Sequence, residues 1–146
     1  MRLSGVNPIM NGKRAEKSHI RRVGLPGTKY TMTQDFYKRR LTDRNIQVLI
    51  PNEDDIEVVN TTIFNELCVG KIREESRKKF QEIIGKLEAD GAEGVILGCT
   101  EIGLLIHQSD VSIPVFDTAE IHAKKAVERA LEEPAAPAVL HRFNIL

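Results

Sequence analysis

The segment that most constrains the fold is a short apolar run that ends in a glycine, a cysteine and two polar residues. Residues 94–97 are apolar throughout, and the tetrapeptide Gly98-Cys99-Thr100-Glu101 follows them directly. Strands that are buried on both faces of a parallel sheet have continuous apolar sequences of this kind. Ligands of open α/β sheets bind outside the carboxyl ends of the strands. The sequence therefore predicts a buried strand over 93–97 that carries the Cys99 thiol to one edge of a parallel sheet, where a helix begins.

The place of Cys99 after this strand predicts a reactive thiol. The first N–H groups of a helix and the positive end of its dipole favour a thiolate over a thiol. An unperturbed cysteine has a pKa of about 8.5, and lowering it to about 7 requires about 2 kcal/mol in favour of the anion. One or two N–H donors at a helix start supply stabilisation of that size. The alternative is that Cys99 fills core space as a small apolar side chain, as many buried cysteines do.

Short apolar runs alternate with amphipathic segments along the chain. The apolar runs predict strands over 20–25, 46–50, 93–97 and 113–116. Helical spacing and capping residues predict helices from Thr31 or Thr33 to about Arg40, and over 54–67, 73–89, 101–107 and 118–132. Strands that alternate with helices indicate an α/β fold, a three-layer lobe with a mostly parallel sheet.

The composition excludes several classes of protein. The chain has 146 residues, 21 basic and 21 acidic side chains, and no tryptophan. Zero net charge provides no field that attracts nucleic acid or an anionic membrane, and the few aromatic residues argue against base stacking. Neither cysteine has a Cys or His at metal-finger spacing, so we expect no metal site and two free thiols. Without an apolar signal segment or membrane span, we expect a cytoplasmic protein.

Three loops follow predicted strands and precede predicted helices, over 27–31, 98–101 and 117–119. In a parallel sheet all three lie at the same edge. Hydroxyl and N–H groups at helix starts bind carboxylates, and a thiolate beside them transfers protons. The loops therefore predict a small anionic substrate and acid–base chemistry by a cysteine. Thr28 and Thr31 have an alternative role, because threonines at helix starts commonly cap the helix.

Three blocks of the sequence resemble the second half of an aspartate/glutamate racemase. Residues 23–32 read VGLPGTKYTM, residues 93–102 read EGVILGCTEI, and residues 114–118 read PVFDT. The similarity extends from about Ile20 to Leu131. This resemblance implies one lobe of a fold in which two similar α/β lobes enclose the active site. It also implies catalysis without pyridoxal phosphate, metal or any other cofactor.

The resemblance implies a role for each site residue. Two cysteines face each other across the substrate in this family, and Cys99 matches one of them. One cysteine removes the α-proton as a thiolate, and the other donates a proton on the opposite face. Thr100 and the adjacent N–H groups would hold the α-carboxylate, while Thr28 and Thr31 would grip the substrate from the other loop. Glu101 would orient the thiol or the substrate amino group, in a 1,1-proton transfer at Cα of a small acidic amino acid.

The chain departs from the family pattern in its first part. No glycine-rich opening strand and no Cys-Asn-Thr loop precedes the matching blocks. We therefore expect a non-family arm over 1–19, a racemase-like lobe over 20–132 and a tail over 133–146. Cys68 is interpreted as a packing residue away from the site. The strand over 113–116 would lack its parent sheet, so it would pack on this lobe, pair with another chain or stay loose.

Two hypotheses of function follow. The first is an amino-acid racemase of the aspartate/glutamate type that is truncated here, with little activity alone because its second catalytic cysteine is missing. The second is a non-catalytic binding or oligomerisation module derived from a racemase, since the face left by a missing lobe favours association. We expect a homodimer. A hydantoin racemase, maleate isomerase or malonate decarboxylase is a further alternative, although residues 28–31 and Glu101 favour the aspartate/glutamate branch.

Overall fold

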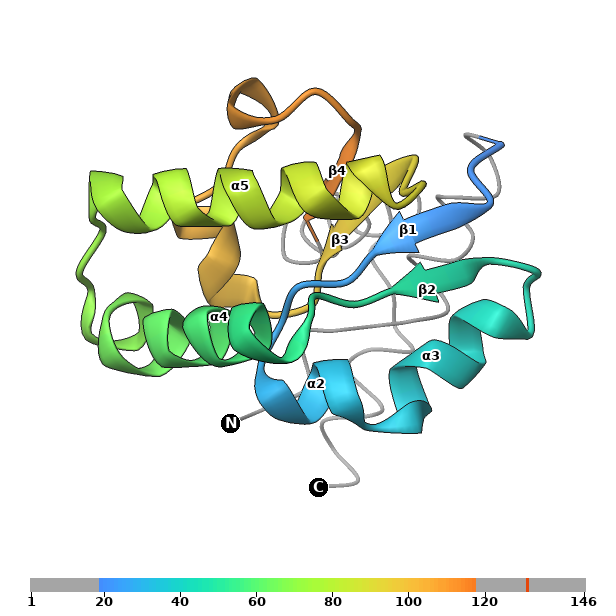
Figure 1. Ribbon diagram of the computed structural model, residues 1–146, viewed down its shortest axis with the longest axis horizontal. Helices are drawn as coiled ribbons and strands as arrows, with labels where there is room; N and C mark the ends of the chain where they lie inside the picture. Colours follow the sequence, from blue (N-terminus) through green and yellow to red (C-terminus); the bar gives the residue numbers. More distant parts are fainter. Residues whose placement is uncertain (1–18, 118–130, 132–146) are drawn as a thin grey trace.

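A sheet of four parallel strands organises the computed structural model, which describes residues 19–117 and 131 (Figure 1). The strands are β1 Arg22–Gly24, β2 Gln47–Leu49, β3 Gly94–Leu97 and β4 Val115–Asp117. Their spatial order is β2-β1-β3-β4, and each of the three neighbouring pairs is parallel. The predicted α/β class and parallel sheet are therefore confirmed.

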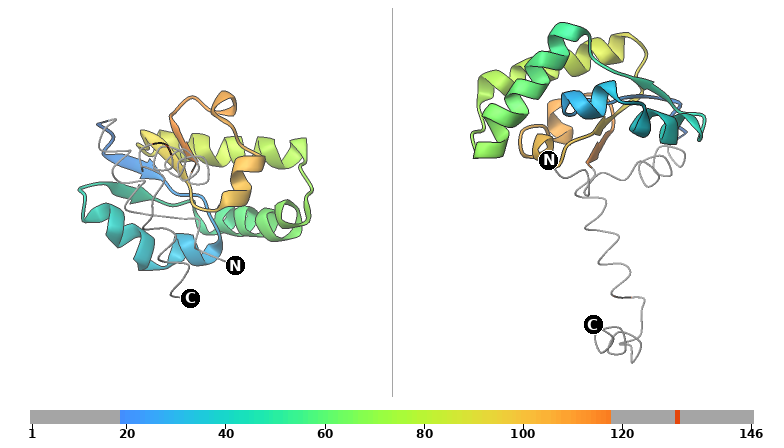
Figure 2. Two further views of the ribbon diagram at one scale, coloured as in Figure 1. Left: turned by 180° about the vertical axis from the view of Figure 1, so that it is seen from behind. Right: turned by 90° about the horizontal axis from the view of Figure 1, so that it is seen from below.

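The helices cover both faces of this sheet. The α-helices are α2 Lys29–Thr33, α3 Asp35–Thr42, α4 Glu53–Asn65 and α5 Glu74–Ala89, and the 3₁₀ helices are η2 Leu67–Val69, η3 Thr100–Leu104 and η4 Gln108–Asp110. Helices α4 and α5 lie side by side, and the Lys86 ammonium joins the Asp55 carboxylate between them at 2.9 Å (Figures 1 and 2). In the part of the chain that the structure describes, no helix is long and apolar enough to cross a lipid bilayer.

Two apolar cores on opposite faces of the sheet give the lobe its three layers. In β3, Val95 and Leu97 pack into the core formed with α4 and α5. Ile96, which points to the other face, packs into the core that holds Tyr37 and Leu41 of α3. Alternation of this kind is what a strand imposes on successive side chains. The central strand is buried along its whole length, as its continuous apolar sequence predicts.

The strand β4 belongs to the same sheet as the other three. Val95 pairs with Val115, and Leu97 pairs with Asp117 in parallel register. Of the three arrangements considered for this segment, the structure shows the first, in which the strand packs on this lobe. The predicted helix over 118–132 lies outside the described residues, apart from Leu131. The arm over 1–19, apart from His19, and the tail over 133–146 also lie outside them, so the domain boundaries stay predictions.

The single helix predicted from Thr31 or Thr33 to about Arg40 is two helices in the structure. Gln34 is extended, with φ −85° and ψ 149°, and separates α2 from α3. The break allows the two helices to face different cores, because Met32 of α2 packs with α4 and α5 whereas Tyr37 packs on the opposite face. The helix also starts earlier than predicted, since Thr28 rather than Thr31 or Thr33 is its N-cap.

Capping residues fix both ends of the segment that follows β2. The Asn52 side chain accepts a hydrogen bond from the Asp55 N–H at 2.8 Å, so α4 begins at Glu53. Gly70 ends η2 with φ 78°, a left-handed conformation that glycine adopts without strain. The predicted stop at Gly70 is confirmed.

Candidate active site

The loops after β1 and β3 are in direct contact, because these two strands are neighbours in the sheet. The Gly98 N–H donates to the Pro26 carbonyl oxygen at 2.8 Å. A Cβ atom placed on Gly98 would lie 3.2 Å from Thr31 Cγ2, and one placed on Gly27 would lie 3.4 Å from the Gly98 carbonyl carbon. The two glycines thus allow a close approach, which brings Thr28 and Thr31 beside the turn that carries Cys99.

The third loop reaches the same edge through Asp117. A Cβ atom on Gly103 of η3 would overlap the Asp117 carboxylate, so that side chain lies directly against η3. The predicted meeting of three loops is therefore what the structure shows for residues 27–31, 98–101 and Asp117. The remainder of the third loop, Thr118 and Ala119, lies outside the described residues.

Thr28 and Thr31 form a short chain of hydrogen bonds. The Thr31 N–H donates to Thr28 Oγ1 at 3.2 Å, and the Thr28 hydroxyl donates to Thr31 Oγ1 at 3.1 Å. Thr28 therefore caps α2, the alternative role considered for it. Both side chains are buried. The Thr31 hydroxyl keeps its own hydrogen, for which no acceptor is found among residues 19–117 and 131, so Thr31 retains one donor for a ligand.

Cys99 is a buried thiol rather than an exposed thiolate. Its exposed fraction is 0%, and its Sγ donates to Glu101 Oε2 at 2.7 Å. Burial, together with the hydrogen bond to the Glu101 side chain, raises the pKa of Cys99 to about 12. The hydrogen bond with the Glu101 backbone lowers the pKa of Cys99, as expected for a helix start, but burial of the thiol raises this pKa by more. The expected low pKa is therefore wrong, because η3 is a five-residue 3₁₀ helix and the thiol packs in the apolar core.

Glu101 is the charged member of this pair. Its Oε2 atom accepts hydrogen bonds from Cys99 Sγ and, at 3.0 Å, from the Thr100 hydroxyl. The hydrogen bond from Cys99 is the main cause that lowers the pKa of the Glu101 carboxyl group. Glu101 and Thr100 are both partly exposed. At neutral pH the site thus holds a thiol that points its proton at an ionised carboxylate, and that carboxylate reaches the surface.

Cys68 lies nearer to this pair than the sequence indicates. It is exposed, so its interpretation as a packing residue is wrong. The helix η2 that carries it contacts η3, and the Glu101 carboxylate adds to the effect of burial in raising the pKa of Cys68. The sequence gives no signal for this proximity, because Cys68 and Cys99 are joined only through the packing of η2 on η3. Both thiols are free, as predicted.

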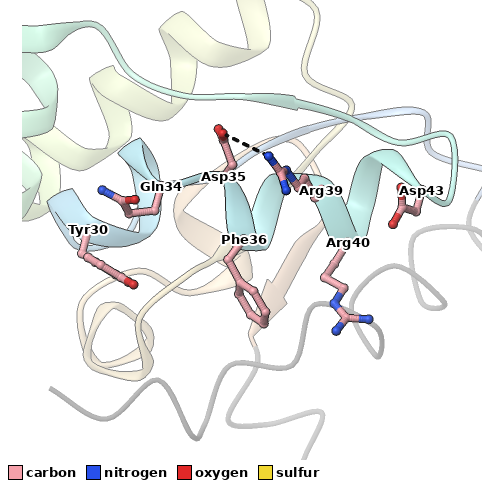
Figure 3. A pocket seen from close by; sticks show the side chains of 7 residues that line it. All are labelled: Tyr30, Gln34, Asp35, Phe36, Arg39, Arg40 and Asp43. Atoms are coloured by element: carbon pink, nitrogen blue, oxygen red, sulfur yellow. Dashed lines mark ion pairs between the residues drawn. The ribbon is translucent and has the colours of Figure 1, made fainter.

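A separate groove of about 430 Å³ runs along α2 and α3, lined by side chains between Tyr30 and Asp43 (Figure 3). It contains neither thiol. Its charges are partly paired within the chain, since Arg39 joins Asp35 at 3.9 Å and the Arg40 guanidinium lies 5.6 Å from the centre of the Phe36 ring. Within the described ranges, no group of three or more His, Cys, Asp or Glu side chains is arranged to hold a metal ion. The Cys99–Glu101 pair is therefore the better candidate for chemistry.

Comparison with known proteins identifies the family of this chain. Residues 11–126 match the Asp/Glu/hydantoin racemase family. The chain belongs to this family. It is 47% identical to an Asp/Glu racemase candidate from Yersinia pestis, with a TM-score of 0.78 over 84% of this chain. It is 43% identical to an aspartate racemase homologue from Pyrococcus horikoshii, with a TM-score of 0.77 over 87% of this chain.

The chain spans about half the length of the solved structures that it matches. It covers 54% of the Yersinia pestis chain and 56% of the Pyrococcus horikoshii chain. An aspartate racemase from Picrophilus torridus, which is 24% identical with a TM-score of 0.61 over 79% of this chain, shares the fold and is covered to 48%. The sheet and helices described above therefore correspond to one lobe of these longer chains.

Proposed function

We propose that this chain forms the Cys99 half of an amino-acid racemase that acts on aspartate or glutamate, by 1,1-proton transfer at Cα without a cofactor. Membership of the racemase family supports the class of reaction. The observation that carries the proposal is the 2.7 Å hydrogen bond from Cys99 Sγ to Glu101 Oε2, at the sheet edge where the loops meet. An acid–base reaction needs a group that can both lose and regain a proton, and this pair has one proton shared between two such groups.

In the proposed mechanism Glu101 accepts the proton of the thiol. The thiol proton passes to the Glu101 carboxylate along their hydrogen bond, which leaves a thiolate on Cys99. The thiolate then takes the α-hydrogen of the substrate as a proton, and the electron pair of the C–H bond stays on Cα as a carbanion. The proton on Cys99 exchanges with solvent through the partly exposed Glu101, and its return to Cα restores the starting enantiomer. Inversion needs a proton from the opposite face, which a group outside this lobe supplies.

The surroundings of the pair suit an amino-acid substrate. The positive α-ammonium group of the substrate offsets the charge of Glu101, which is partly exposed beside the thiol. The Thr31 hydroxyl hydrogen donates to a substrate carboxylate. The Thr100 hydroxyl, which donates to Glu101 in the structure, turns to a substrate carboxylate on binding, in the role that the sequence predicts for it. Thr28 acts indirectly, because its oxygen caps α2 and its hydrogen holds Thr31.

Exchange of the α-hydrogen in heavy water tests this proposal. We expect the chain to introduce deuterium at Cα of one enantiomer of aspartate or glutamate, measured by mass spectrometry, with little racemisation by chiral chromatography. Cys99→Ser should abolish the exchange, whereas Cys68→Ser, a change at the exposed thiol, should retain most of it. Equal exchange with and without the Cys99 thiol would overturn the assignment.

The proposal also includes a cytoplasmic, homodimeric protein. The cytoplasmic location rests on the two free thiols. Exposed apolar side chains on α4, η2 and η3, namely Phe64, Val69 and Leu104, favour association. Sedimentation velocity of the purified chain measures the oligomeric state, and a monomer at all concentrations would contradict the dimer.

A further inference from the structure

We propose that Asn60, on α4, is a positioning residue that holds the β1–α2 loop and its two threonines against the turn that carries Cys99. The contact itself is independent of any activity, while its importance for substrate binding rests on the proposed function. Neither the apolar spacing of α4 nor the resemblance to racemases assigns a role to this residue. The argument starts from one hydrogen bond that joins two elements distant in the sequence.

The Asn60 side chain binds the first backbone N–H of α2. Its Oδ1 atom accepts a hydrogen bond from the Lys29 N–H at 2.7 Å, across 31 residues of sequence. Lys29 is the first residue of α2, and α2 packs against the start of α4 (Figure 1). The bond is short and therefore well formed for an N–H donor and an amide oxygen.

The helix α2 needs an external partner at this position. The first N–H groups of a helix have no partner within it, and with five residues α2 has few internal hydrogen bonds. The Thr28 hydroxyl satisfies the Thr31 N–H, and the Thr28 carbonyl oxygen satisfies the Met32 N–H. The Lys29 N–H is satisfied by Asn60 instead, so this side chain fixes the orientation of α2 together with the packing of buried Met32 on α4 and α5.

A displaced α2 would change the candidate site directly. Thr31 lies against Gly98, the residue before Cys99, with 3.2 Å between its Cγ2 and an ideal Cβ position on Gly98. A second link between α2 and α4 is the ion pair of Lys29 Nζ with Glu57, but both side chains are 56% exposed. Exposed ion pairs of this kind hold elements together only weakly. Asn60 binds the backbone of α2 rather than the end of a long side chain, so it is the more direct of the two polar links.

Three variants of the full chain separate these contributions by amide hydrogen exchange. Asn60→Ala removes the acceptor, Asn60→Asp keeps a side-chain oxygen at the same place, and Glu57→Ala removes the neighbouring ion pair one turn away. We expect Asn60→Ala to speed exchange of the Lys29 and Thr31 amides by about threefold to tenfold, the factor that one lost hydrogen bond produces. Asn60→Asp should restore slow exchange, and Glu57→Ala should stay near the wild type.

Binding of L-aspartate, measured by calorimetry, then tests the link to the site. Weaker binding by Asn60→Ala, by about threefold or more, with recovery in Asn60→Asp, would support the positioning role. Unchanged amide exchange in Asn60→Ala, or equal loss of binding in Glu57→Ala, would overturn it. If the wild-type chain binds neither L-aspartate nor L-glutamate while the exchange pattern is as expected, the proposed function fails and the structural role of Asn60 stands.

Discussion

Replacement of Glu101 by glutamine is expected to lower the pKa of the Cys99 thiol. The pKa of this thiol is raised from 9.0 to about 12, a difference worth about 4 kcal/mol in favour of the protonated form. Burial is the first cause and is unchanged by the substitution. The hydrogen bond to a charged acceptor is worth about 1.5–3 kcal/mol, so its loss should lower the pKa by about one to two pH units.

The ultraviolet absorbance of the thiolate measures this change. The titration is made in a Cys68→Ser background, because the exposed Cys68 thiol would otherwise add its own signal. At about pH 10, a thiol with a pKa of about 12 is about 1% ionised, whereas one lowered by one to two pH units is about 10–50% ionised. Ionisation should therefore rise at least about tenfold in the variant.

A matched control removes a carboxylate that does not touch the thiol. Glu93, just before β3, pairs with Arg22 on the surface at 3.6 Å, and Glu93→Gln should leave the titration of Cys99 unchanged. An unchanged or higher pKa of Cys99 in Glu101→Gln, with the circular dichroism of the folded chain preserved, would refute the reasoning.

Four further predictions concern the stability of the lobe. The pKa of Cys99 is higher in the folded chain than in the unfolded chain, so the stability that the protonated thiol contributes is fully present below about pH 9 and is lost as the pH rises toward about 12. Urea unfolding should therefore show a fall in the free energy of unfolding over this pH range, and Cys99→Ser should reduce that fall. An identical fall in both proteins would contradict the prediction. Gly98→Ala should cost about 1–3 kcal/mol, because its Cβ would lie 3.1 Å from the Pro26 carbonyl oxygen. In contrast, Gly85→Ala in the exposed part of α5, where the new Cβ meets nothing within 4 Å, should stabilise the fold by about 0.5–1 kcal/mol in the same assay. Asn52→Ala should lower the free energy of unfolding by about 1 kcal/mol through loss of the α4 cap, and no change would mean that water replaces the cap without cost.

The parts of the fold that sequence reasoning predicts well depend on local patterns. The strand β3 and the helix α5 lie within one residue of their predicted bounds, because an apolar run and a helical apolar spacing are visible in short windows. The break between α2 and α3 at Gln34 is not visible in a short window of sequence. It depends on which of two cores receives Met32 and which receives Tyr37, and that is decided by packing over the whole lobe.

In the candidate site, too, sequence reasoning predicts the features that depend on local patterns and misses those that depend on packing. The order of strands brings Thr31 beside Gly98, as expected for loops that follow neighbouring parallel strands. The protonation state of Cys99 is different from the prediction, because it depends on burial by distant segments and on the direction of the Glu101 side chain. The exposure of Cys68 likewise depends on how η2 packs on η3. The sequence thus predicts where the Cys99 thiol lies, at the start of a helix, but it does not predict the pKa of that thiol.

The infrared S–H stretch of Cys99 tests the central claim most directly, because it detects the proton that the mechanism moves. In a Cys68→Ser background at neutral pH, the account predicts one S–H band, shifted to low frequency by the hydrogen bond to Glu101. The band should move toward the position of a free thiol in Glu101→Gln and vanish in Cys99→Ser. Absence of an S–H band in the protein that retains Cys99 would mean that the thiol is already ionised, and would contradict the account.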